Sequence, residues 1–345
     1  MSFTTAPVRR AGTVHQLPTP FGVGLGLGGA AVLASGLVGV VADGSGYYGE
    51  MASLAVVGAS AMLGGRLLNR LQQRGRVTRA IGMAMLVAGW VAITLVSLTA
   101  FFISGEFAGV SDAVFEAVSA TTTTGFTTAE APENLTYGIR FLRVALQWTT
   151  GAGVLMAGLG VLPVAIAGAE LVPHSPLEAS RRLVRGLWSG TRRIFGLYLL
   201  LSSSLMIGFL LAGLSIFDAV SYAMSVSSTG GFANHADSIG HFDDQAVTTI
   251  ATVGMFAAGG NLAVVWWAFR GAYSSVWKST ELRLYVCLSF IGFVIVWASS
   301  GDLGVIESAF AVASVVSTTG LRSANWAGVA RGATDHDCEF ALVVE

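Results

Sequence analysis

Charge and cysteine are both scarce in this chain of 345 residues. Charged side chains make up only 11% of it, and a single lysine, Lys278, accompanies eighteen arginines. The formal net charge of −1 indicates no particular partner, and we expect no nucleic-acid partner. The two cysteines, Cys287 and Cys338, are too few for a disulfide framework, and Cys287 lies in an apolar run where packing is its expected role.

Familiar catalytic motifs are missing as well. The sequence contains no HExxH, GxSxG or GxxxxGK[ST] pattern, which would carry zinc, serine-nucleophile or phosphate chemistry. An intramembrane protease would need a Ser/His or Asp pair inside its spans, and the apolar segments lack such pairs. We therefore expect no enzymatic activity and no covalently bound cofactor.

Hydrophobic residues and glycine, by contrast, are abundant. Hydrophobic residues make up 53% of the chain and 44 residues are glycine, which is typical of a multi-pass membrane protein. The expected spans are residues 21–42, 50–65, 80–104, 140–166, 194–214, 245–269 and 284–300. The first could instead be a signal peptide, but it is longer than most signal-peptide cores and another span follows at once.

One pattern occurs three times, around Gly125, Gly231 and Gly320. Each copy has an acid, a serine, a hydroxyl and a threonine at fixed distances before the glycine, and a large apolar residue directly after it. These residues are Asp112, Ser119, Thr122, Thr123 and Phe126 in the first copy, Asp218, Ser225, Ser228, Thr229 and Phe232 in the second, and Glu307, Ser314, Ser317, Thr318 and Leu321 in the third. Matched offsets in three places indicate an internal repeat.

Each copy has the features of a half-helix that enters the membrane and stops inside it. The run from the acid to the hydroxyls has about ten apolar or small residues, a helix of roughly 15 Å or half a bilayer core. We expect these helices at 112–122, 217–228 and 307–317, with the acids as helix-start residues at the positive end rather than as catalytic groups.

The Thr-Gly segment after each half-helix can point successive carbonyls one way, because glycine adopts backbone conformations closed to other residues. A half-helix followed by such a carbonyl-lined segment is typical of a cation filter. Packing between helices is the alternative role for glycine, and we favour it for Gly151, Gly153, Gly259 and Gly260. Packing alone does not explain why the same residue types occur at the same distances before all three glycines.

Basic residues alternate between the two sides of the expected membrane. Fifteen of the nineteen lie in the N-terminus and in the loops 66–79, 181–193 and 270–283. Because lysine and arginine concentrate in cytoplasmic loops, we expect these segments in the cytoplasm, with the half-helices entering from outside.

Histidines and acids cluster after the second copy, at His235, Asp237, His241, Asp243 and Asp244. Their spacing matches no known metal motif, so we interpret the stretch as a solvated external loop that raises the local cation concentration modestly. The tail group at 335–338 is interpreted in the same way. Arg322 could be a charge at the pore mouth or an interfacial anchor.

The repeated segments resemble the TrkH/KtrB/HKT superfamily of potassium transporters, in its TrkH-like branch. The segments that carry the resemblance are FEAVSATTTTGFTT (115–128), RFLRVALQWTTGAGVLMAGLGVLP (140–163), SIFDAVSYAMSVSSTGGF (215–232), FAAGGNLAVVWW (256–267) and AVASVVSTTGL (311–321). The resemblance implies an all-α polytopic membrane protein in which units of span, re-entrant pore helix, filter loop and span surround a pseudo-fourfold pore.

The resemblance also implies the transported ion and the partners. The expected activity is passive or gradient-coupled permeation of K⁺, with symport as the coupled form, through a selectivity filter of backbone carbonyls. The expected filter residues are Thr122, Thr123, Thr124, Gly125, Ser228, Thr229, Gly230, Gly231, Ser317, Thr318, Thr319 and Gly320. The implied setting is the cytoplasmic (inner) membrane of a prokaryote, with a homodimeric membrane part and a cytosolic nucleotide-binding regulatory subunit of the TrkA/KtrA type.

The chain departs from the family pattern after Leu321, where 24 residues follow without an apolar run long enough to cross. A fourth unit is missing from the pattern. We expect a truncated product, one half of a split transporter completed by a separate chain with the fourth pore repeat, or an incomplete reading of a longer gene. The alternative function is a subunit that does not conduct and only packs against a partner as a scaffold. Residues 1–345 alone are then not expected to rescue potassium uptake.

We divide the chain accordingly. The expected parts are a cytoplasmic N-terminus (1–20), two leading transmembrane helices with a basic loop (21–79), a first pore repeat (80–180), a second (181–283), an incomplete third (284–330) and an atypical tail (331–345).

Overall fold

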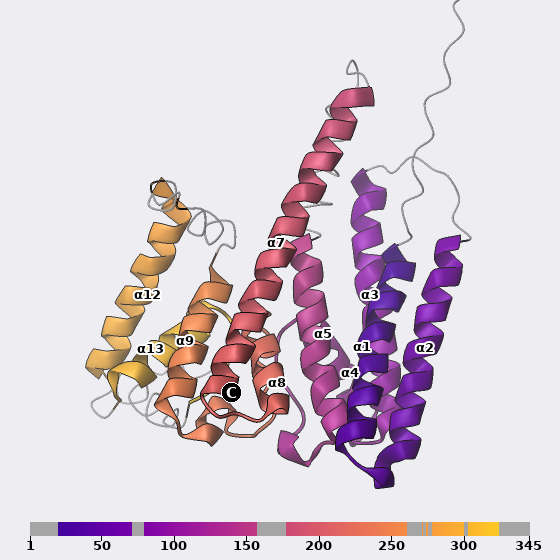
Figure 1. The fold of residues 1–345 in the computed structure, drawn as a ribbon, viewed down its shortest axis with the longest axis horizontal. Coiled ribbons are helices and arrows are strands. Elements are labelled where there is room, and N and C mark those ends of the chain that lie inside the picture. Colours follow the sequence, from indigo (N-terminus) through magenta and orange to yellow (C-terminus); the bar gives the residue numbers. More distant parts are fainter. Residues whose placement is uncertain are drawn as a thin grey trace, which may run out of the picture.

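The computed structural model describes residues 20–70, 79–156, 177–260, 278–299 and 303–323, together with Gly271 and Ser274. Within these ranges the chain forms ten α-helices, three short 3-10 helices and no strand (Figure 1). The α-helices are α1 (Pro20–Ala42), α2 (Tyr48–Arg70), α3 (Arg79–Ser104), α4 (Val110–Thr121), α5 (Tyr137–Met156), α7 (Leu177–Leu211), α8 (Ile216–Ser227), α9 (Gln245–Gly259), α12 (Thr280–Ser299) and α13 (Val305–Val316); the 3-10 helices are η1 (Ser45–Tyr47), η2 (Pro132–Asn134) and η4 (Ser238–Phe242). The expected all-helical fold is confirmed.

Five of the described helices contain stretches long and apolar enough to cross a membrane. These stretches are Phe21–Ala42, Tyr48–Arg70, Val87–Ser104, Arg192–Leu211 and Thr280–Ser299. Only 6% of the stretch in α12 is buried, and large apolar side chains such as Phe290 and Ile295 are exposed along it, as expected for a helix that faces lipid. The expectation of a multi-pass membrane protein is confirmed.

Several expected segments lie partly or wholly outside the described residues. They are the N-terminus up to residue 19, the loop 71–78, the ends of the two return spans at 157–166 and 261–269, and the tail 331–345.

The expected basic loop at 181–193 is instead part of a helix. α7 runs without interruption from Leu177 to Leu211, and its 35 residues correspond to about 52 Å, against a hydrocarbon core of about 30 Å. The first residues of α7 include leucine, arginine, glutamate and alanine, which all favour helix. The helix therefore continues through the charged residues before its apolar stretch instead of beginning after them. Figure 1 shows α7 rising past the neighbouring helices.

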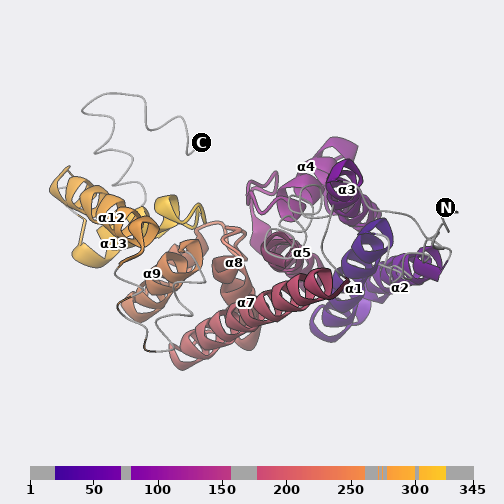
Figure 2. The same ribbon diagram turned by 90° about the horizontal axis from the view of Figure 1, so that it is seen from above.

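The leading helices α1 and α2 pack closely through glycine. A Cβ added at Gly29 would lie 2.6 Å from the carbonyl oxygen of Gly58, and Gly58 has the reciprocal contact with Gly29. Such small residues let two backbones approach without side chains between them. α1 also packs against α3 and α5, so the leading pair is attached to the first repeat (Figure 2).

Three helices of twelve residues, α4, α8 and α13, are the expected half-helices. They begin one or two residues before the expected positions, and the acids Asp112, Asp218 and Glu307 lie in their first turns. α4, α8 and α13 pack against the spans that precede them, α3, α7 and α12. α8 and α13 also pack against the return helix of the preceding unit, α5 and α9 respectively. The units therefore follow one another with the same neighbours each time.

Candidate functional site

All three half-helices end in the same backbone motif. The residue after each C-cap has a left-handed backbone: φ is 56° at Thr123, 52° at Thr229 and 59° at Thr318. The next amide donates a 3.0 Å hydrogen bond to the carbonyl of the repeated serine, from Thr124 to Ser119, from Gly230 to Ser225 and from Thr319 to Ser314. This is a Schellman motif, in which the left-handed position is usually glycine. A β-branched residue there is strained, and such strain gathers at functional sites.

The repeated glycines are left-handed too. φ is 82° at Gly125, 78° at Gly231 and 76° at Gly320, whereas the residue between each threonine and its glycine has no positive φ. Successive carbonyls of an ordinary extended strand point to opposite sides, and left-handed residues at alternate positions turn them toward the same side. The segments 122–125, 228–231 and 317–320, which contain all twelve sequence-predicted filter residues, thus share one backbone conformation. We refer to them as loops 1, 2 and 3.

In two of the three copies the repeated serine also forms a hydrogen bond with the residue that follows the glycine. Ser119 Oγ donates to the carbonyl of Phe126 at 2.6 Å, and Ser314 Oγ donates to the carbonyl of Leu321 at 2.7 Å. In the second copy the equivalent Ser225 hydroxyl, in α8, is buried without a hydrogen-bond partner among the described residues. The sequence pattern identified these serines, but their partners became visible only in the structure.

The three loops lie next to one another in order. A Cβ added at Gly125 would overlap the carbonyl oxygen of Gly230, and one added at Gly231 would overlap the carbonyl oxygen of Thr319. Each of these two glycines therefore faces the same atom of the next loop, as expected for successive members of a ring. Around Gly320, no atom of the described residues lies within 4 Å of the Cβ position.

The supports behind loops 2 and 3 are also repeated. Tyr198 donates to the carbonyl of Trp148 at 3.0 Å, and Tyr285 donates to that of Phe256 at 3.1 Å. Gly151 and Gly259 bring α5 and α9 against Ser228 and Ser317, respectively. The packing role expected of these two glycines fits the contacts, whereas a Cβ at Gly153 would meet no described atom within 4 Å.

A buried ion pair that the sequence did not reveal lies beside loop 1. Glu116 Oε2 on α4 accepts from Arg143 Nε on α5 at 3.1 Å. Glu116 Oε1 accepts from the amide of Thr128 at 2.9 Å and from the hydroxyl of Thr127. The two acceptor oxygens thus connect the half-helix to the segment after Gly125 and to the return helix. The only sign of this ion pair in the sequence is that both charged residues lie within otherwise apolar segments.

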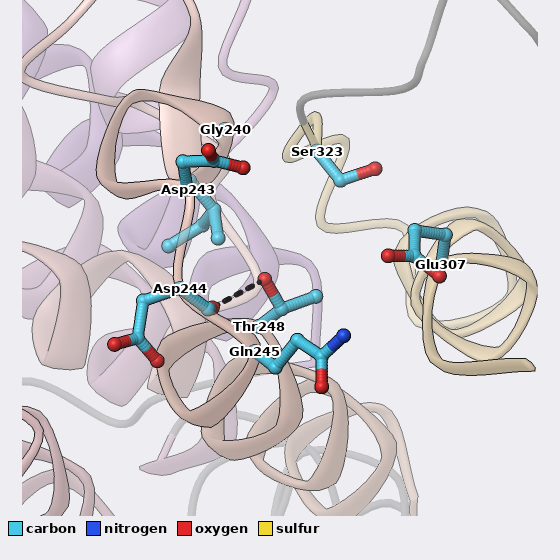
Figure 3. Close-up of a pocket in the computed structure, with 8 residues that line it drawn as sticks. Gly240, Asp243, Asp244, Gln245, Thr248, Glu307 and Ser323 are labelled. Atoms are coloured by element: carbon cyan, nitrogen blue, oxygen red, sulfur yellow. Dashed lines mark hydrogen bonds between the residues drawn. The ribbon is translucent and has the colours of Figure 1, made fainter. Parts of the chain in front are cut away.

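A small acidic cavity of about 160 Å³ lies between the segment 239–244, the start of α9 and the start of α13 (Figure 3). Its lining includes Asp243, Asp244 and Glu307, and one of these acids is already engaged, since Asp244 Oδ1 accepts from the amides of Ala246 and Val247 at the start of α9. In the described part of the chain, no group of three or more His, Cys, Asp or Glu residues is placed to hold a metal ion.

The two histidines of the cluster contact each other and the start of α8. The rings of His235 and His241 stack at 3.7 Å between centroids, and His235 Nε2 lies 3.5 Å from Asp218 Oδ1. Arg322 donates from its guanidinium to the carbonyl of Ala236 at 2.7 Å and from its amide to Ser238 Oγ at 3.2 Å. Arg322 therefore connects the end of loop 3 to the segment 236–238 after loop 2.

No protein-family model matches the chain. It is, however, similar to curated potassium uptake proteins over most of its length. It is 26% identical to Trk system potassium uptake protein TrkH of Escherichia coli K12 over 264 residues, which cover 72% of this chain and 54% of that protein. It is 30% identical to TrkH of Vibrio parahaemolyticus over 223 residues (62% and 46%) and 29% identical to TrkI of Halomonas elongata over 265 residues (73% and 53%). The chain thus spans about half the length of the curated relatives it matches.

The fold matches a solved transporter structure as well. The crystal structure of the potassium transporter TrkH from Vibrio parahaemolyticus superposes with a TM-score of 0.73, at 24% identity, over 92% of this chain and 69% of that one. The chain therefore has the fold of this transporter structure over most of its length, and its sequence is similar to Trk potassium uptake proteins over about half of theirs.

Proposed function

We propose that the chain forms part of a potassium-selective pore and that K⁺ binds to backbone carbonyls of loops 1, 2 and 3. The observation that carries the proposal is the repeated conformation in which left-handed threonine and glycine alternate with other residues. Aligned carbonyls can replace part of the hydration shell of a potassium ion. The proposed coordinating residues are Thr122–Gly125, Ser228–Gly231 and Ser317–Gly320.

The half-helices support cation binding electrostatically. The C-terminal end of a helix carries a partial negative charge, and α4, α8 and α13 all end directly before these loops. Discontinuous helices within a membrane use such ends to stabilise cations. The protein therefore provides the electrostatic field of the helix ends and the arrangement of the carbonyls. The ion itself undergoes no chemical change.

The similarity to Trk proteins supports a wider setting for this pore. We infer that it lies in the inner membrane of a prokaryote with its N-terminus in the cytoplasm. We also infer that it works as a dimer with a cytosolic nucleotide-binding subunit. The coupling of K⁺ movement to a second ion is part of the same proposal.

Ion-dependent stabilisation of the purified chain in detergent tests the proposal. A ligand that binds only the folded state stabilises it by about 2.7 kcal/mol at 100 times its Kd, so K⁺ should raise the unfolding temperature more than Na⁺ or choline does. Gly231→Ser should abolish this preference, because its side chain would overlap the carbonyl of Thr319. Gly153→Ser, at a position where a Cβ would meet no described atom within 4 Å, is the matched control.

Equal stabilisation by Na⁺ and K⁺ would refute the selective site. Transport itself is measured as ⁸⁶Rb⁺ uptake in cells that lack potassium transporters and express the natural gene with its flanking DNA. Absence of uptake there would contradict the pore.

A further inference from the structure

Loop 2 differs from loops 1 and 3 at the residue before the glycine. Loops 1 and 3 have Thr124 and Thr319 there, and loop 2 has Gly230. Each threonine hydroxyl lies 2.7 Å from the hydroxyl two residues earlier, that of Thr122 or Ser317. Loop 2 lacks this internal contact because Gly230 has no side chain. Another part of the protein must then support loop 2.

That support is Gln147, a fully buried residue of α5. Its Nε2 donates to the carbonyl of Gly230 at 2.5 Å, and its Oε1 accepts from the amide of Phe232 at 3.3 Å. One side-chain amide thus holds the backbone on both sides of Gly231. A Cβ at Gly230 would overlap the Gln147 amide group, so the missing side chain of Gly230 makes room for this contact.

The second return helix shows what replaces Gln147 elsewhere. Gly151 contacts Ser228 as Gly259 contacts Ser317, which aligns α5 with α9. The residue four positions earlier is Gln147 in α5 and Met255 in α9, and both are fully buried. Met255 has no amide to donate or accept. By this alignment the position of Gln147 corresponds to Met255, and the position of Gly230 corresponds to Thr319.

We propose that Gln147 is a positioning residue for ion selectivity, which holds loop 2 from outside in place of the threonine contact used within loops 1 and 3. The proposal rests on the proposed function, because selectivity presupposes that the loops bind K⁺. Gln147 does not coordinate the ion in this scheme. It fixes the peptide groups on both sides of Gly231 and thereby fixes the direction of their carbonyls.

Amide hydrogen exchange of the purified full chain in detergent tests the support itself, independently of transport. Gln147→Met removes both hydrogen bonds with little change of length. Exchange in the peptide that contains Thr229–Phe232 should then accelerate by about two- to tenfold, the range given by one ordinary hydrogen bond. Loops 1 and 3 should exchange as in the wild type. Met255→Leu, at the equivalent position of α9, is the control and should leave loop 2 unchanged.

A compensating pair provides a second, sharper test. Gly230→Thr alone should disrupt loop 2, because the new side chain overlaps Gln147. Combined with Gln147→Met, it gives loop 2 the residues found at the equivalent positions of loop 3. The double variant should therefore recover slow exchange. Its loop 2 should exchange more slowly than the summed effects of the two single variants predict. Additive behaviour, or unchanged exchange in Gln147→Met, would overturn the proposal.

The selectivity readout separates this proposal from the proposed function. The preference for K⁺ over Na⁺ in thermal stabilisation should fall by about two- to tenfold in apparent affinity ratio in Gln147→Met and return in the double variant. An unchanged ratio despite faster exchange would refute the role in selectivity. If the wild type shows no preference for K⁺, the proposed function fails, and with it the role in selectivity, while the exchange results still decide whether Gln147 holds loop 2.

Discussion

The carboxylate of Glu116 and the guanidinium of Arg143 lie 3.1 Å apart, and their side chains are only 0% and 1% exposed, respectively. Arg143 also stacks on the ring of Phe232, with its Cζ 4.2 Å from the ring centroid. Glu116 reaches the segment after loop 1, and Arg143 reaches the residue after Gly231. A single ion pair thus links the two neighbouring loops.

Removing one member of this pair should destabilise the protein strongly. Arg143→Met leaves the Glu116 carboxylate buried without its counter-charge, which typically costs about 3–5 kcal/mol. We expect a large drop in the temperature at which the detergent-solubilised protein loses its monodisperse chromatographic peak. The double variant Glu116→Gln/Arg143→Met removes both charges and should recover much of the loss. A single variant as stable as the wild type would show that the pair contributes little.

The repeated glycines Gly125, Gly231 and Gly320 should differ in their tolerance of alanine. All three have positive φ, which costs a residue with a side chain roughly 1–2 kcal/mol. At Gly125 and Gly231 the added Cβ also overlaps a carbonyl oxygen of the next loop, whereas at Gly320 it meets no described atom within 4 Å. Thermal unfolding should therefore rank Gly320→Ala as the mildest variant. If Gly320→Ala proves as damaging as Gly231→Ala, the positive φ alone sets the cost.

Stability should fall in mild acid because of His235. Burial is the main cause that holds the pKa of His235 below its ordinary value, and the nearby His241 and Arg140 act in the same direction against Asp218. As the pH falls through the ordinary value of about 6.5, the unfolded chain binds the proton before the folded protein does, so folding loses stability down to the folded-state pKa. Unfolding temperatures measured between pH 7.5 and 5 should record this loss.

Two variants identify the histidine responsible for that loss. His235→Gln should flatten the profile between pH 6.5 and 5. His241→Gln removes one of the lowering influences, so it should weaken the loss without abolishing it. An unaltered acid profile in His235→Gln would assign the effect to other groups.

The proposed orientation predicts labelling from opposite sides. Asp243, between η4 and α9, and Lys278, before α12, are both exposed. In a background without Cys287 and Cys338, a membrane-impermeant thiol reagent should label Asp243→Cys in intact cells and Lys278→Cys only after the membrane is opened. Labelling of both in intact cells would contradict the half-helices entering from outside.

The half-helices were predictable because their signals are local and repeated. An acid in the first turn and a Thr-Gly pair after the last turn mark both ends of α4, α8 and α13, so the observed bounds lie within two residues of the expected ones. The predicted start of this span, at residue 194, was wrong. The arginines before it suggested a loop, but these residues favour helix, and α7 begins at Leu177.

The sequence by itself determined the helical membrane class, the threefold repeat and the loop residues, since hydropathy and backbone preference act over a few neighbouring positions. Tertiary structure alone decided what holds those loops. Glu116 and Arg143 are 27 positions apart and Gln147 and Gly230 are 83 apart, and their contacts depend on how α4, α5 and α8 pack. Burial of charge and amide groups forces each to find a partner, but which partner is set by the packing of the helices.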